Sequence, residues 1–162
     1  AIASALAAGK RYLGVATGFV GQSGPSGFQL VSFAEEFARE TASEARVRFV
    51  HASPDAPTVD LGILNAEQVV NPILAAGLSF RSASAEAGQG VGTGQIPIGI
   101  TPAGMNDAVV ASFHVNTAAG VRAFALASGA LAPASQQVPG LRLLVVDTTP
   151  TPWTVATVHP QP

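Results

Sequence analysis

The chain has 162 residues and a formal net charge of −2, and only 11% of its residues are charged, against about 25% in an average soluble domain. The absence of cysteine excludes disulfides, thiolate metal sites and cysteine nucleophiles, and the lack of any basic run argues against a nucleic-acid partner. No apolar stretch reaches the length of about 18 residues that a membrane-spanning helix needs, so we expect no membrane insertion.

An internal repeat begins close to the first residue. Residues 7–19 (AAGKRYLGVATGF) match residues 118–130 (AAGVRAFALASGA), and residues 27–31 match 140–144 after a loop that is two residues longer. The repeat is therefore about 110 residues long, the size of a domain. The identical positions of the first segment are Ala7, Ala8, Gly9, Arg11, Ala16 and Gly18.

The repeat predicts the domain organisation. We expect residues 1–37 to be the tail half of a first β repeat, 38–45 to be a charged linker, and 46–162 to be a complete β-sandwich repeat with a terminal strand. On this interpretation residue 1 lies near the end of a strand equivalent to 108–116. The sequence leaves open whether that position is a native start, a fragment end or a processing boundary.

Period-2 alternation between Gly- and Pro-rich turns predicts an all-β antiparallel sandwich or barrel. We expect the complete copy to be a two-sheet sandwich whose strands share one apolar inner face. The predicted strands are 10–20, 28–34, 46–52, 58–64, 78–85, 95–101, 108–116, 121–130, 141–147 and 153–159. The predicted core comprises Val47, Phe49, Val59, Leu61, Ile96, Ile98, Val109, Phe113, Phe124, Leu126, Leu143 and Val145.

A rigid turn follows the strand 46–52. It reads HASPDAP, and its two prolines fix φ and remove two backbone donors, while the Asp side chain can close an Asx turn. This strand–HASPDAP–strand segment resembles a family of secreted-protein domains, the domain of unknown function 4397. The resemblance also rests on Val59-Asp60, on Thr101-Pro102-Ala103-Gly104 and on the Ala-Ala-Gly strand starts.

The resemblance covers residues 46–147 and, as a partial copy, 7–37. It implies an immunoglobulin-like or transthyretin-like sandwich, export from the cell and a tandem arrangement of domains. It implies no activity. The Gly-rich insertion near 81–95 departs from the pattern of the family.

The turn holds the residues that would carry chemistry. A His–Asp cluster of His51, Asp55 and Asp60 is one interpretation, but the pattern lacks a third ligand or an activated nucleophile. The glycines at 88–94 do not have phosphate-loop spacing and predict a flexible hairpin loop. We therefore expect no enzyme, catalytic residue, cofactor or metal, and a structural motif formed by His51, Ser53, Pro54, Asp55, Pro57 and Asp60.

The incomplete front copy needs a cover for its apolar face and its strand edges. Three alternatives stand: a preceding segment of the natural protein, docking as extra strands of one enlarged sandwich, or strands from another subunit. The run VATVH at 155–159 repeats the pattern VRFVH at 47–51, which is one supporting detail for the third alternative. The possible assembly strand comprises Trp153, Val155 and Val158.

Two hypotheses of function follow. The first is an extracellular structural or adhesive cell-surface module that assembles head to tail into a filament through β-strand complementation. Its partners would be other copies of itself or neighbouring repeats. The second is a module that binds surface glycans or another ligand, through exposed loops such as 86–94 or through Trp153.

Overall fold

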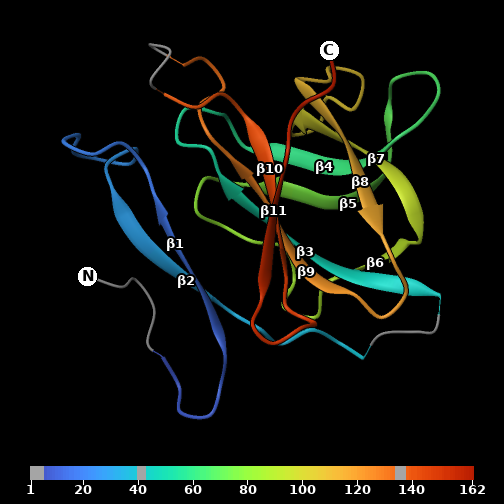
Figure 1. Cartoon of the computed structure of the whole chain (residues 1–162). Coiled ribbons are helices and arrows are strands. Elements are labelled where there is room, and N and C mark those ends of the chain that lie inside the picture. The colour runs from blue at the N-terminus through green and yellow to red at the C-terminus, as the bar shows by residue number, and fades with distance from the viewer. Residues whose placement is uncertain (1–5, 40–42, 134–137) are drawn as a thin grey trace.

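The computed structural model describes residues 6–39, 43–133 and 138–162, and it is built from strands and loops, without a helix in these ranges (Figure 1). No helix that could cross a membrane occurs among the described residues. Residues 1–5 of the predicted front copy and 40–42 of the predicted linker lie outside the described part. The strands are β1 Tyr12–Thr17, β2 Gln29–Ala34, β3 Glu44–Ala52, β4 Val59–Leu64, β5 Val70–Leu78, β6 Gln89–Gly92, β7 Gly94–Pro102, β8 Ala111–Thr117, β9 Arg122–Ser128, β10 Arg142–Asp147 and β11 Thr154–Val158.

Two sheets form a sandwich. One has five strands in the order β11-β10-β9-β3-β6, and the other has four in the order β5-β4-β7-β8. Neighbouring strands are antiparallel except β3 and β9, which are parallel. The predicted all-β sandwich is therefore confirmed, whereas its finer likeness to the immunoglobulin or transthyretin fold stays a prediction.

The sandwich core forms because alternate residues of the facing strands are apolar. Phe49 of β3, Leu61 of β4 and Phe113 of β8 are at most 1% exposed, and they belong to one cluster between the sheets. Leu143 of β10 joins them from the five-stranded sheet. The core thus draws on both sheets.

The hairpin β1–β2 forms a third layer. It is a separate two-stranded sheet, coloured blue in Figure 1, which lies against the outer face of the five-stranded sheet. Leu13 and Val15 of β1 lie opposite Phe33 and Val31 of β2, and this apolar side faces the sandwich. A second buried cluster joins the two layers: Val31, Phe33, Val50, Phe124, Leu126 and Val146, with Leu13, Val15, Phe37, Ala83, Leu144 and Trp153 packed against it.

A buried arginine lies between these layers. The Arg48 side chain donates from Nη1 to the Ala34 carbonyl at 2.8 Å and from Nε to the Ser84 carbonyl at 3.1 Å. Its guanidinium carbon lies 5.7 Å from the Phe33 ring centroid and 5.8 Å from that of Phe124. Burial lowers the pKa of Arg48, and the charge of Glu86 opposes this shift. Arg48 therefore ties β2 to the sandwich through hydrogen bonds and cation–π contacts.

Several sequence-based expectations were wrong. The predicted strand 78–85 is mostly loop, and β5 lies earlier, at Val70–Leu78, where Pro72 and three register shifts disrupt the alternation. The Gly-rich segment is not a free hairpin loop, because β6 pairs with β3. Phe124 and Leu126 are buried on the outer face, under the hairpin, and Val109 is half-buried ahead of β8.

None of the three alternatives given for the cover of the front copy describes the structure in its simplest form. The hairpin docks on its own chain, but as a sheet of its own rather than as extra strands of the sandwich. The boundaries 1–37, 38–45 and 46–162 stay a prediction, although β3 already begins at Glu44.

Replacing Phe113 by Ala should lower the free energy of unfolding by about 3–5 kcal/mol, because the ring is fully buried in the sandwich core. Urea denaturation measures this loss. Val110→Ala is the matched control, since Val110 is 40% exposed and should change stability little. Equal midpoints for the two variants would show that the inner face is assigned wrongly.

Replacing Arg48 by Met should weaken the attachment of the hairpin, because the Ala34 and Ser84 carbonyls lose their donor. Each buried carbonyl left without a donor costs about 1–3 kcal/mol of stability. The single Trp of the chain, Trp153, packs against the cluster under the hairpin and reports this change by its fluorescence. We expect a red-shifted emission at lower urea than for the unchanged chain. The exposed Arg39→Met variant should behave as the unchanged chain, and identical curves for both variants would contradict the role of Arg48.

Candidate functional site

The turn between β3 and β4 occupies the end of the sandwich next to the hairpin loops. β3 ends at Ala52, the turn begins with Ser53 and Pro54, and β4 begins at Val59. The turn ends β3 because Pro54 and Pro57 cannot donate to a neighbouring strand. The strand, the turn and the second strand that the sequence predicts here are therefore confirmed.

His51 is buried inside this turn, with 1% of its surface exposed. Its Nε2 lies 2.8 Å from the Pro57 carbonyl, so Nε2–H donates there, and Nδ1 accepts the Ser53 N–H at 3.3 Å. Burial lowers the pKa of His51 below its usual 6.5, while the hydrogen bond to Pro57 opposes that shift. Both ring nitrogens of the neutral imidazole are therefore occupied by the turn itself.

Asp55 connects the turn to the loop between β9 and β10. Its Oδ1 accepts the N–H of Leu131 at 2.8 Å, and its Oδ2 accepts that of Ala132 at 3.0 Å. The Ser53 hydroxyl donates to Oδ1 at 3.2 Å. Burial would raise the pKa of Asp55, but the N–H groups of Ala132 and Leu131 lead the hydrogen bonds that lower it on balance.

Asp60 has a different set of partners. Its Oδ1 accepts the Gly77 N–H at 2.6 Å and its Oδ2 accepts the Gly104 N–H at 2.8 Å. It thus joins the end of β5 to the turn after β7. Within the described residues, no three His, Asp or Glu side chains are grouped so that they could hold a metal ion.

The turn also binds the hairpin. The Ser26 hydroxyl donates to the Pro54 carbonyl at 3.1 Å, and the Thr17 hydroxyl donates to the Ala52 carbonyl at 2.9 Å. The small cavity beside His51 is lined by apolar side chains such as Val59 and Ile100, and its volume is only about 10 Å³. Such a cavity holds at most one water molecule. The turn therefore holds the β1–β2 loop and the β9–β10 loop in place at this end of the sandwich.

The sequence pointed to the turn but missed its partners. Ser26, Leu131 and Ala132 lie 28, 76 and 77 residues away from the turn residues they bind, and backbone N–H donors leave no trace in a motif. Only the repeat gave a usable signal. It placed the loops 18–27 and 129–140 in equivalent positions, and the turn contacts both.

The predicted assembly strand is β11. It pairs antiparallel with β10 at the edge of the five-stranded sheet, with Val158 opposite Leu143 and Val155 opposite Val146. Trp153 packs against the cluster under the hairpin, and the Arg11 guanidinium carbon lies 5.5 Å from its ring centroid. Val158 packs against the sandwich core, whereas Val155 is 65% exposed.

The stability of the fold should decrease as the pH falls below about 6.5, because the unfolded chain binds a proton at His51 that the folded chain resists. A second decrease should begin below about 3.8, as the Asp55 carboxylate, whose folded pKa is lowered, loses its N–H partners on protonation. Urea unfolding measured across this pH range tests both.

His51→Gln should remove the first decrease. A variant with both exposed histidines changed, His114→Gln and His159→Gln, should retain it. If His51→Gln and the unchanged chain lose stability in parallel between about pH 7 and 5, His51 is not the source of the first decrease.

Comparison with known proteins agrees with the sequence resemblance over part of the chain. A family model described as a domain of unknown function, DUF4397, matches residues 2–62, which include β1, β2, β3 and the whole turn. Residues 63–147 of the predicted complete copy lie beyond that match. No curated protein and no solved structure matches the chain. Residues 2–62 are therefore similar to the domain of unknown function DUF4397.

Proposed function

We propose that the chain is an extracellular structural or adhesive module, and that it assembles head to tail through β-strand pairing. One observation carries this proposal. Two strand edges, one on β1 and one on β11, have no neighbouring strand among the described residues, and neither strand contains a charged residue or a proline. Unprotected edges of this kind recruit other chains.

Each of the other four edges in the described structure is short, irregular or contacted by another part of the chain. β5 contains Pro72 and irregular register, and β6 has only four residues. β8 is approached by the end of the chain, because the Gln161 N–H donates to the Ser112 carbonyl at 2.8 Å. Along β2, Arg48 donates to the Ala34 carbonyl. Protection at these four edges makes the open state of the remaining two significant.

An extracellular location is supported by composition. The chain has 11% charged residues, one lysine and 12 prolines, and such a low charge suits close packing against other chains. The resemblance of the turn motif to secreted-protein domains points the same way. A structural role also accounts for the turn, whose polar side chains are used to hold loops in place.

A ligand-binding module is the second candidate, and one hollow favours it. An open depression of about 490 Å³ lies at the loop of the hairpin, lined by Gln22, Ser23, Gln29, Arg81 and the 56% exposed Phe28. An exposed ring beside amide groups suits a saccharide. The two positions expected from the sequence fit less well, since Trp153 is packed under the hairpin and β6, Gln89–Gly92, lies within 86–94. Retention on a glycan array, lost on Phe28→Ala, would favour this function over assembly.

Assembly should be lost in Val155→Lys, because a lysine on the exposed side of an open edge strand opposes the approach of a second strand. Light scattering over a concentration series measures it. We expect the average mass of the unchanged chain to rise with concentration and that of the variant to stay at the monomer value. Val20→Lys is the matched control, since Val20 is 84% exposed and lies outside the strands.

Point substitution is preferable to deletion of residues 153–162, because Trp153 and Val158 pack against buried clusters. A monomeric unchanged chain at every concentration, in the presence and absence of salt, would refute the proposed assembly.

A further inference from the structure

The strands of the hairpin β1–β2 and those of the hairpin β9–β10 pair in the same way. Tyr12 lies opposite Ala34 in the first, and Ala123 lies opposite Asp147 in the second, so the strands correspond with shifts of 111 and 113 residues. Gly18 has φ of 98° and Gly129 has φ of 94°. A Cβ at either glycine would lie 2.2 Å from a carbonyl oxygen, that of Gly27 or of Gly140, so both loops require glycine at the same point.

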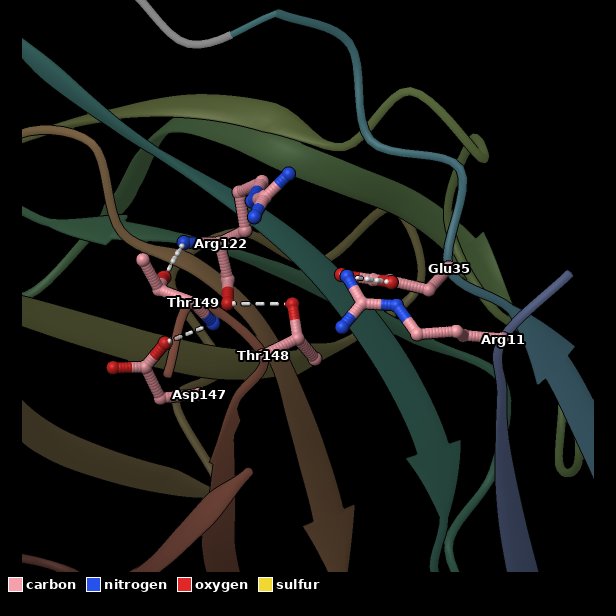
Figure 2. A network of polar contacts seen from close by, with 6 residues as sticks. All are labelled: Arg11, Glu35, Arg122, Asp147, Thr148 and Thr149. Atoms are coloured by element: carbon pink, nitrogen blue, oxygen red, sulfur yellow. Dashed lines mark hydrogen bonds and ion pairs between the residues drawn. The ribbon is translucent and has the colours of Figure 1, made fainter. Parts of the chain in front are cut away.

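The other ends of the two hairpins also agree. The Glu35 N–H donates to the Arg11 carbonyl at 2.9 Å, and the Thr148 N–H donates to the Arg122 carbonyl at 2.8 Å. Figure 2 shows both places: the Arg11 guanidinium pairs with the Glu35 carboxylate, whereas the Arg122 backbone is held by the hydroxyls of Thr148 and Thr149. The side chains differ, but the backbone geometry is conserved between the two hairpins.

The two hairpins also pack against each other through corresponding faces. Leu13 and Val15 of β1 correspond to Phe124 and Leu126 of β9, and all four lie in the cluster between the layers. The opposite face of β9, with Ala125 and Ala127, lines the sandwich core. The corresponding residues of β1 are Gly14 and Ala16, and both are exposed.

β9 has a neighbouring strand on both edges, whereas the described residues place a strand beside β1 on one edge only. β3 runs parallel to β9 along the edge away from β10, with Val47 opposite Ala123 and Phe49 opposite Ala125. The Gly120 N–H donates to the Glu44 carbonyl at 3.0 Å as this pairing begins. Gly9, which corresponds to Gly120, has the same φ of 78°. The edge of β1 is therefore preshaped for a parallel strand of the β3 type.

β11 is a strand of this type. Its run Val155-Ala156-Thr157-Val158-His159 agrees with Val47-Arg48-Phe49-Val50-His51 at the two valines and the histidine. In its own chain it uses one edge to pair with β10, and the described residues place no strand on the other.

Deepening the proposed function, on which it rests, we infer that β11 of a second copy adds in parallel to β1, with Val155 opposite Tyr12 and Thr157 opposite Gly14. The order β2-β1-β11 then reproduces β10-β9-β3 across the boundary between two chains. Every residue of this contact face is accessible at the outset: Val155 is 65% exposed, Gly14 and Thr157 are exposed, and Tyr12 is half-buried. Addition therefore requires no buried side chain to be released.

Four single-cysteine variants test the register in a chain that has no cysteine of its own: Tyr12→Cys, Gly14→Cys, Val155→Cys and Thr157→Cys. A Cβ at Gly14 meets no atom within 4 Å, so that cysteine fits. Each β1 variant is mixed with each β11 variant, oxidised, and run on a non-reducing gel. Directly opposed residues on neighbouring strands are close enough for a disulfide, whereas a shift of two residues separates the Cα atoms by about 8 Å, which is too far.

We expect crosslinks in the mixtures 12 with 155 and 14 with 157, and none in 12 with 157 or 14 with 155. The reverse pattern would mean antiparallel addition and would overturn the inferred register, while the proposed assembly would stand. Assembly of the reduced variants by light scattering, without any of the four crosslinks, would place the contact elsewhere and also overturn the inference. Reduced variants and an unchanged chain that all stay monomeric would refute the proposed function itself.

Discussion

The packing of Phe33 and Phe124 around the Arg48 guanidinium is the contact on which the arrangement of layers depends. A hairpin of two strands has little stability by itself, so β1–β2 needs a surface to bury its apolar side. The outer face of β9 and β10 supplies Phe124, Leu126 and Val146. Arg48 adds directional bonds to this apolar contact, because its donors reach carbonyls of both layers.

A buried cation costs free energy unless its donors and its charge are compensated. Here the Phe33 and Phe124 rings lie within cation–π range, and two carbonyls accept hydrogen bonds from the guanidinium. Lysine could not reproduce this geometry, since its ammonium is a compact charge without a planar fork. The arginine thus fixes where β2 lies, and β2 in turn determines which edge of β1 is left open.

The sequence predicted the all-β sandwich and the repeat, because both depend on local patterns. Alternation located β7 and β10 within a residue at each end, and the glycines at 18 and 129 marked equivalent loops. Alternation could not assign faces in β9, where Phe124 and Leu126 alternate with Ala123, Ala125 and Ala127, because all are apolar and both sides are buried. The hairpin that covers the outer side is a tertiary feature.

The candidate site was predictable in its residues but not in its contacts. The prolines and Asp55 indicated a rigid turn. The donors to the Asp55 carboxylate, however, come from a distant loop, and Leu131 lies 76 residues after Asp55. β5 and β6 were missed for a related reason. Pro72 and the glycines at 90 and 92 resemble loop residues, and only pairing with β4 and β3 makes these segments strands.

The central claim is that the open edges of β1 and β11 are the surfaces through which copies join. Amide hydrogen exchange, compared below and above the concentration at which the chain assembles, tests it most directly. The account predicts that protection rises together in residues 12–17 and 154–158, while the interior strand β4 is unchanged. Protection that rises in other segments, with β1 and β11 still exchanging as in the monomer, would contradict it.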